Sequence, residues 1–191
     1  MNLKYVKICS KNIVLAAQIQ YKIFHNSCAY KKYLEGIKIN DDLPVDFLIY
    51  YNENPIGVVG LYDMPEYGDT IWLSWFGILE EYRHKGFGLQ IFKDTILIAK
   101  GYNKKFLRLF TYEVWNSEAQ EFYKKNMQIE EYYTNPQDNQ YDIQVGKCKI
   151  FGYSLCEDKI DYWNNKFIDI DSDDEVHEES LILMKQHGII K

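Results

Sequence analysis

The sequence predicts a mixed α/β fold built as a single domain of 191 residues. Short apolar runs that suit strands alternate along the chain with amphipathic segments that suit helices, an order typical of a mixed sheet covered by helices. A glycine-spaced turn joins one of these strands to a helix. The length and the 47% of hydrophobic residues are enough to bury one sizeable core.

The first third of the chain predicts a strand, a helical region and a hairpin. The strand covers residues 4–8, and the helical region covers 12–33, where repeated Ile, Leu, Ala and Phe would cover the sheet. The segments 46–51 and 56–62 are strand-like and are joined by Asn52-Glu53-Asn54-Pro55. Because Asn and Pro favour tight turns, we expect the two segments to form a hairpin.

The turn Arg83-His84-Lys85-Gly86-Phe87-Gly88 is the most informative stretch of the chain. It follows the strand-like run 71–78 and precedes a helical segment from Leu89 to Lys100 with its apolar residues on one face. Gly101 would end that helix in the left-handed conformation. A strand that stops at such a turn leaves unpaired N–H groups at the positive end of the helix dipole, where proteins bind phosphate. The pattern therefore predicts a pyrophosphate site.

The two glycines of this turn support the same interpretation. Without a Cβ at Gly86 and Gly88, a phosphate group could approach the backbone closely. An ordinary tight turn would use the same residues, so the glycine pair alone is weak evidence. A dinucleotide site or a P-loop is less well supported, because the third glycine and the Gly-Lys-Ser/Thr sequence are both missing.

A second strand and helix follow the turn. The run 106–112 predicts a strand, and 116–126 predicts a short helix that begins after a good N-cap residue. With these elements the chain resembles the GNAT superfamily of acyl-CoA-dependent N-acetyltransferases. In that family an Arg/Gln-x-x-Gly-x-Gly/Ala turn binds the CoA pyrophosphate, and Asn-x-x-Ala-x-x-x-Tyr leads from the next strand into a helix. The chain supplies Arg83, Gly86 and Gly88 for the first motif and Asn116, Ala119 and Tyr123 for the second.

The resemblance covers the chain from about Met1 to about Cys156. It implies a twisted, mostly antiparallel mixed sheet with helices on both faces, and acetyl-CoA as the cosubstrate. One strand would pair with the pantetheine arm, the turn would hold the pyrophosphate through its N–H groups, and Tyr123 would protonate the departing CoA thiolate. Asn116 would contact the pantetheine region. The implied cosubstrate-binding residues are Phe76, Gly77, Ile78, Arg83, His84, Lys85, Gly86, Phe87, Gly88, Leu89 and Asn116.

The identity of the general base is the main departure from the family pattern. Many members carry a glutamate on the strand before the turn, where this chain has Ser74, and a glycine followed by an aromatic residue where it has 127–129. Glu113, at the end of the second strand, is our candidate for the base, since an amine must lose a proton before it attacks a thioester. The alternative is a solvated carboxylate beside a turn. Asp63 and Glu66 are weaker alternatives.

Composition restricts the class of partner and the compartment. A net charge of −6 does not fit a nucleic-acid-binding surface, which would be basic, and it favours a cationic substrate. No apolar stretch could span a bilayer, so no membrane partner is expected. The cysteines lack CxxC spacing and the histidines lack metal-ligand spacing, so we expect reduced thiols, a cytoplasmic protein and no bound metal.

The C-terminal segment is an addition to the family core. The chain divides on this interpretation into a GNAT domain, 1–156, which ends with a strand at 147–155, and an extension, 157–191. The acidic run in the extension lacks the glycine and the glutamate of a calcium loop. We expect instead an acidic loop and a helix, 175–186, packed on the same domain. This helix could cover a sheet edge, line the substrate cleft or join two subunits as a homodimer.

The resemblance and the residues together predict an N-acetyltransferase. The predicted reaction moves the acetyl group of acetyl-CoA to a primary amine, of a small molecule in the first instance, by direct transfer in a ternary complex. A protein N-terminus or a lysine is the second choice of acceptor. A different class also fits: a module that binds acyl-CoA without turnover, since Ser74 replaces the usual base.

Overall fold

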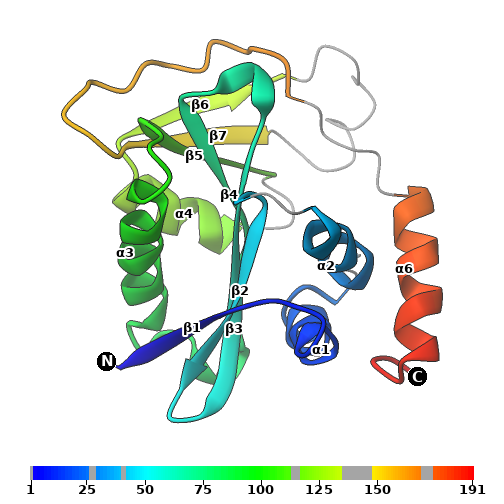
Figure 1. Ribbon diagram of the computed structural model, residues 1–191. Helices are drawn as coiled ribbons and strands as arrows, with labels where there is room; N and C mark the ends of the chain where they lie inside the picture. Colours follow the sequence, from blue (N-terminus) through cyan, green and yellow to red (C-terminus); the bar gives the residue numbers. More distant parts are fainter. Residues whose placement is uncertain (1, 26–28, 40–41, 113–116, 135–147, 169–173) are drawn as a thin grey trace. The chain divides into compact units, whose positions relative to one another are not determined.

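The structure is a computed structural model in which the described residues form two compact units (Figure 1). The first unit comes from 1–63, 73–97 and 171–191, and the second comes from 64–72 and 98–170. A seven-stranded sheet, in the order β1-β2-β3-β4-β5-β7-β6, draws strands from both. The mixed α/β class is therefore confirmed. The described residues are 2–25, 29–39, 42–112, 117–134, 148–168 and 174–191.

In the first unit, β1 (Leu3–Lys7), β2 (Val45–Tyr51) and β3 (Asn54–Asp63) pair as antiparallel neighbours. The predicted hairpin is confirmed. Its turn is made by Asn52 and Glu53, whose φ angles of 47° and 63° lie in the left-handed region that turn residues tolerate.

Helices cover both faces of these strands. The predicted helical region is two helices, α1 (Ile13–Phe24) and α2 (Ala29–Lys38), on one face, and α3 (Phe87–Lys100) lies on the other (Figure 1). The core beneath α1 and α2 is mainly apolar, and small and branched side chains interlock there. Its fully buried members include Ala16, Ala17, Ala29, Leu48 and Met184.

The C-terminal helix α6 (Asp174–Gln186) packs on α2 in the first unit (Figure 1). Met184 is completely buried, the ring of His187 stacks on Tyr30 at 4.8 Å, and Glu179 forms an ion pair with Lys31. Gly188 then follows the helix with a φ of 67°, in the left-handed region that glycine adopts easily. The helix therefore contributes to the core around α1 and α2.

The strand β4 (Thr70–Ile78) precedes a 3₁₀ turn, η2 (Glu80–Tyr82), and α3. The helix begins at Phe87, two residues before the predicted start, so the end of the glycine turn is its first turn. The prediction for Gly101 is wrong, since Gly101 does not have a positive φ. The chain reverses at Asn103, whose φ is 55°, after Gly101 N–H donates to Ile98 O.

The second unit contains β5 (Phe106–Tyr112), α4 (Ser117–Asn126), β6 (Ile129–Tyr133) and β7 (Cys148–Ser154). The strand β6 was not predicted from the sequence, and β7 confirms the predicted last strand. A 3₁₀ turn, η1 (Pro65–Tyr67), precedes β4.

A buried arginine organises the segment that follows β7. Arg108 donates from Nη2 to Asp161 O at 2.6 Å, and its guanidinium lies 5.2 Å from the Trp163 ring. Glu131 accepts the backbone N–H of Asn164 at 2.9 Å. Residues 157–168 thus pack on the second unit, and the predicted domain boundary at 156 stays a prediction. Within the described residues, no helix is both long and apolar enough to cross a bilayer.

Candidate functional site

The glycine turn before α3 exposes backbone donors. His84 and Gly86 have φ angles of 57° and 82°, which bend the chain sharply out of η2. The first helical hydrogen bond runs from Gln90 N–H to Gly86 O at 3.2 Å. The N–H groups between Gly86 and Gln90 therefore precede the hydrogen-bonded part of α3 and point out of its N-terminal end. The turn is exposed from Arg83 to Gly86, so an anion can reach these donors.

Side chains on both sides of the turn fix its shape. Arg83 Nε donates to Ile78 O at 3.1 Å, which ties the turn to the end of β4. Phe87 is buried, and its ring lies 4.8 Å from that of Tyr51 and 5.8 Å from that of Tyr82. The side chain of Phe87 thus anchors the start of α3, and only its backbone N–H is left to serve a ligand.

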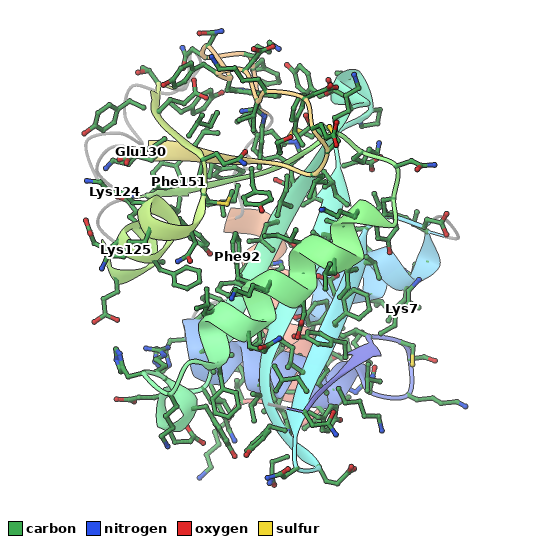
Figure 2. All side chains as sticks on the ribbon, turned by 90° about the vertical axis from the view of Figure 1, so that its left-hand side faces the viewer. Lys7, Phe92, Lys124, Lys125, Glu130 and Phe151 are labelled. Carbon is green, nitrogen blue, oxygen red and sulfur yellow. The ribbon has the colours of Figure 1, made fainter. Side chains whose placement is uncertain are left out.

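The second half of β4 departs from a regular strand. Its parallel ladder with β5 joins Thr70–Trp72 to Phe106–Arg108, and the strand then continues to Ile78 outside that ladder. Trp75 has a φ of 46°, which is rare for a large residue and bends the strand at this point. The predicted residues 76–78 lie beyond the bend, where the ring centroid of Phe76 is 6.4 Å from that of Phe92 of α3. Figure 2 labels Phe92.

The predicted acid Tyr123 lies in α4 of the second unit and is only 6% exposed. Its ring centroid is 5.6 Å from that of Phe151. Burial raises the pKa of Tyr123 above its ordinary value, so the hydroxyl stays protonated through the neutral range. A protonated phenol is the form that can donate a proton to a thiolate.

The remaining predicted site residues are Asn116 and the candidate bases. Glu113 and Asn116 lie outside the described residues. Among the weaker alternatives for a base, Asp63 is half-buried at the end of β3 and Glu66 is exposed in η1. Within the part of the chain that the structure describes, no group of three His, Cys, Asp or Glu side chains could hold a metal ion.

A carboxylate that the sequence analysis did not select lies on β2. Asp46 pairs with Gly60 across the hairpin, and Ser74 approaches from β4. A Cβ at Gly60 would lie 2.1 Å from Asp46 Oδ1 and 2.4 Å from Ser74 Oγ. The two oxygens therefore converge on the space that a side chain at residue 60 would fill.

The surroundings of Asp46 change its acidity. Burial raises the pKa of Asp46 to about 7. The pKa of Tyr33 in α2 is raised by burial and by the charge of Asp46, and the Tyr33 hydroxyl donates to Gln20 Oε1. Asp46 thus changes charge near neutral pH while the tyrosine beside it stays protonated.

A cavity of about 310 Å³ opens beside this carboxylate. The ends of β1, α2 and β2 form its walls, with Lys7, Cys9, Tyr33, Ile37 and Asp46 among the lining residues (Figure 2 labels Lys7). The sequence held one signal for this site. Asp46 shares a strand face with Leu48 and Tyr50 of the core beneath α1 and α2, and a carboxylate on an inward-facing position is a candidate functional group.

Comparison with known proteins identifies related sequences and folds. The family model described as Acetyltransferase (GNAT) family matches residues 14–127. A search of curated proteins gives no match. A GNAT family acetyltransferase from Elizabethkingia anophelis with acetyl-CoA bound superposes with a TM-score of 0.61 at 19% identity, covering 80% of this chain and 98% of that one.

Two further solved structures share the fold. The ribosomal-protein-S18-alanine N-acetyltransferase of Escherichia coli has a TM-score of 0.61 at 12% identity, covering 85% of this chain and 99% of that one. A variant of the spermidine N-acetyltransferase of Vibrio cholerae has a TM-score of 0.62 at 16% identity, covering 80% and 94%. At these sequence identities the structural similarity supports the fold only. Membership of the family rests on the match to the family model.

Proposed function

Because the chain belongs to the acetyltransferase (GNAT) family, we propose that it moves the acetyl group of acetyl-CoA to a primary amine by direct transfer in a ternary complex. The observation that carries this proposal is the turn before α3. There an exposed glycine with a φ of 82° stands at the N-terminal end of a 14-residue helix. Such a turn offers several N–H groups and the positive end of a dipole to a pyrophosphate.

Acetyl-CoA would bind along β4 and across the turn. The N–H groups from His84 to Leu89 hold the pyrophosphate, and Arg83 and Lys85 add positive charge beside it. The pantetheine arm pairs with the backbone of residues 76–78, which is supported by the end of the described β4–β5 ladder at Trp72. Asn116 contacts the pantetheine region in this proposal.

The chemistry requires two proton transfers. The acceptor enters as an ammonium ion and must lose one proton before its nitrogen can attack the thioester carbon. As the C–N bond forms and the C–S bond breaks, the departing thiolate takes up a proton, which Tyr123 supplies. The second proton of the original ammonium leaves the nitrogen as the amide forms and restores Tyr123. Glu113 is the base that the sequence proposes for the first step.

A small-molecule amine is the acceptor that the features favour. The net charge of −6 attracts cations, and the cavity of about 310 Å³ is lined by the Asp46 carboxylate. The spermidine N-acetyltransferase of Vibrio cholerae shares the fold and acts on such an amine by name. A protein N-terminus or lysine is the second choice, since the Escherichia coli enzyme for an alanine of a ribosomal protein shares the fold too. Ser74 favours the other class, an acyl-CoA-binding module without turnover.

The proposal is tested by measuring CoA release with a panel of amines. We expect acetyl-CoA alone to stabilise the protein by about 2.7 kcal/mol at a hundred times its Kd, with Tm rising with the logarithm of concentration. We expect CoA release to require an added amine and to be fastest with small cationic amines. Strong stabilisation by acetyl-CoA with no release across small amines, N-terminal peptides and lysine peptides would favour the binding module.

A further inference from the structure

The first unit contains one acidic side chain among the lining of its cavity, and that side chain is Asp46. Asp94, on α3, already accepts the Tyr5 hydroxyl at 2.7 Å and Gln90 Nε2 at 2.9 Å. Asp42, just before β2, is exposed to solvent. Asp46 differs from both because it is half-buried and lines a cavity of about 310 Å³, which is large enough for a small amine.

The strands place this carboxylate beside β4. Asp46 and Ser74 lie on strands separated by β3, and their side chains can meet because the residue between them, Gly60, has no side chain. Ser74 stands two positions before Phe76, where the proposed pantetheine strand begins. The Ser74 hydroxyl therefore stands between Asp46, which lines the cavity, and the strand on which the thioester would lie.

From this geometry we infer that Asp46 is the general base, which accepts a proton from the acceptor ammonium in the cavity, directly or through the Ser74 hydroxyl. In the relay, Ser74 Oγ gives its proton to an Asp46 oxygen and takes one from the nitrogen, so the serine is unchanged. The neutral amine then attacks the thioester, and Asp46 returns its proton to solvent through the cavity. This inference rests on the proposed function and deepens it by naming the acceptor pocket.

The groups around Asp46 set the pH dependence. Tyr33 faces it from α2, Lys7 and Cys9 line the same cavity from the end of β1, and Ser74 approaches from β4. Burial raises the pKa of Asp46 to about 7, so the carboxylate accepts a proton above pH 7 and is already protonated below it. Transfer should therefore fall as the pH falls through 7.

Asp46 also makes stability depend on pH, but in the opposite direction: the rate of transfer rises with pH, whereas the free energy of unfolding falls. The folded pKa lies above the ordinary value of 3.8, so the folded state binds more protons than the unfolded state between about pH 4 and 7. The contribution of Asp46 to the free energy of unfolding is therefore largest at low pH and falls as the pH rises through this window. A structural carboxylate whose pKa is lowered by folding would instead make the free energy of unfolding rise with pH.

The test compares Asp46→Asn with Asp42→Asn, which removes the same charge from an exposed position four residues away. At pH 7 we expect kcat/KM for the amine to fall about tenfold to a thousandfold in Asp46→Asn, with an unchanged Kd for acetyl-CoA. Asp42→Asn should behave as wild type. Ser74→Ala should slow transfer less, because water can replace the hydroxyl. Urea unfolding between pH 5 and 8 should show a smaller loss of stability with rising pH in Asp46→Asn than in wild type.

The outcomes separate this inference from the proposed function. If wild type transfers acetyl groups and Asp46→Asn retains the whole pH–rate curve, Asp46 is not the base. A loss confined to Glu113→Gln would then assign that role to Glu113. If wild type binds acetyl-CoA and transfers nothing, the proposed function fails, and the role of Asp46 fails with it. The inference is supported if kcat/KM falls in Asp46→Asn and if this variant lacks the change of rate with pH that wild type shows near pH 7.

Discussion

Replacing Gly86 by valine is expected to weaken acetyl-CoA binding by about tenfold to a hundredfold, because backbone strain at such a position costs about 1–3 kcal/mol. The φ of 82° at Gly86 is one that a β-branched residue rarely adopts, so the turn must change its course. The N–H groups of the first turn of α3 would then no longer converge on one pyrophosphate. Isothermal titration calorimetry with acetyl-CoA measures the change in Kd directly.

Gly188→Val is the matched control. Gly188 also has a positive φ, of 67°, and a Cβ there meets nothing within 4 Å, so valine brings the same kind of backbone strain to the end of α6. We expect this variant to lose stability and keep its affinity for acetyl-CoA. Equal affinity for acetyl-CoA in wild type and Gly86→Val would show that the pyrophosphate does not bind at this turn.

Tyr123→Phe should keep the fold and slow acetyl transfer about tenfold to a thousandfold at saturating substrate. Phenylalanine preserves the ring that packs 5.6 Å from Phe151, so only the hydroxyl is lost. Because burial raises the pKa of Tyr123, wild type should supply this proton across the neutral range without a decline towards pH 9. Steady-state kcat, with the Kd for acetyl-CoA measured in parallel, tests the assignment.

Tyr133→Phe provides the comparison for this variant. Tyr133 is also buried in the second unit, and its hydroxyl accepts the backbone N–H of Ile168 at 3.0 Å. Removing that hydroxyl should cost about 1 kcal/mol of stability and leave kcat unchanged. A kcat for Tyr123→Phe as high as that of Tyr133→Phe would make Tyr123 a core tyrosine and move the acid elsewhere.

Much of the fold could be predicted because local patterns agree with the final packing. The run 106–112 is rich in aromatic and leucine side chains, which favour a strand, and it forms β5 with the predicted ends. In contrast, β6 has the sequence Ile129-Glu130-Glu131-Tyr132-Tyr133, whose two glutamates hide its strand character. Tertiary contacts decide that strand, since Glu130 accepts Lys149 Nζ of β7 at 2.7 Å. The helical region 12–33 is divided because α1 ends at His25, whose φ of 55° lies in the left-handed region.

The candidate site could be proposed from the sequence where one stretch of chain makes it. The turn from Arg83 to Gly88 is contiguous, so its glycines and cations could be recognised from the sequence. The space over Gly60 is made by three strands, and nothing in the order of residues brings Asp46 to Ser74. A glycine in an apolar strand is an ordinary feature until the neighbouring side chains are known. Pairing register, which depends on the whole sheet, is what turns these three residues into one site.

The space over Gly60 has a consequence for the evolution of related chains. Two carboxylates that converge on one point repel each other, so a relative with an acidic residue at position 74 should have lost the one at position 46. Gly60 should persist in both kinds of relative, since any side chain there would displace the group above it. If positions 46 and 74 covary among relatives while Gly60 does not change, the proton acceptor has moved between β2 and β4 and has kept the same position in space.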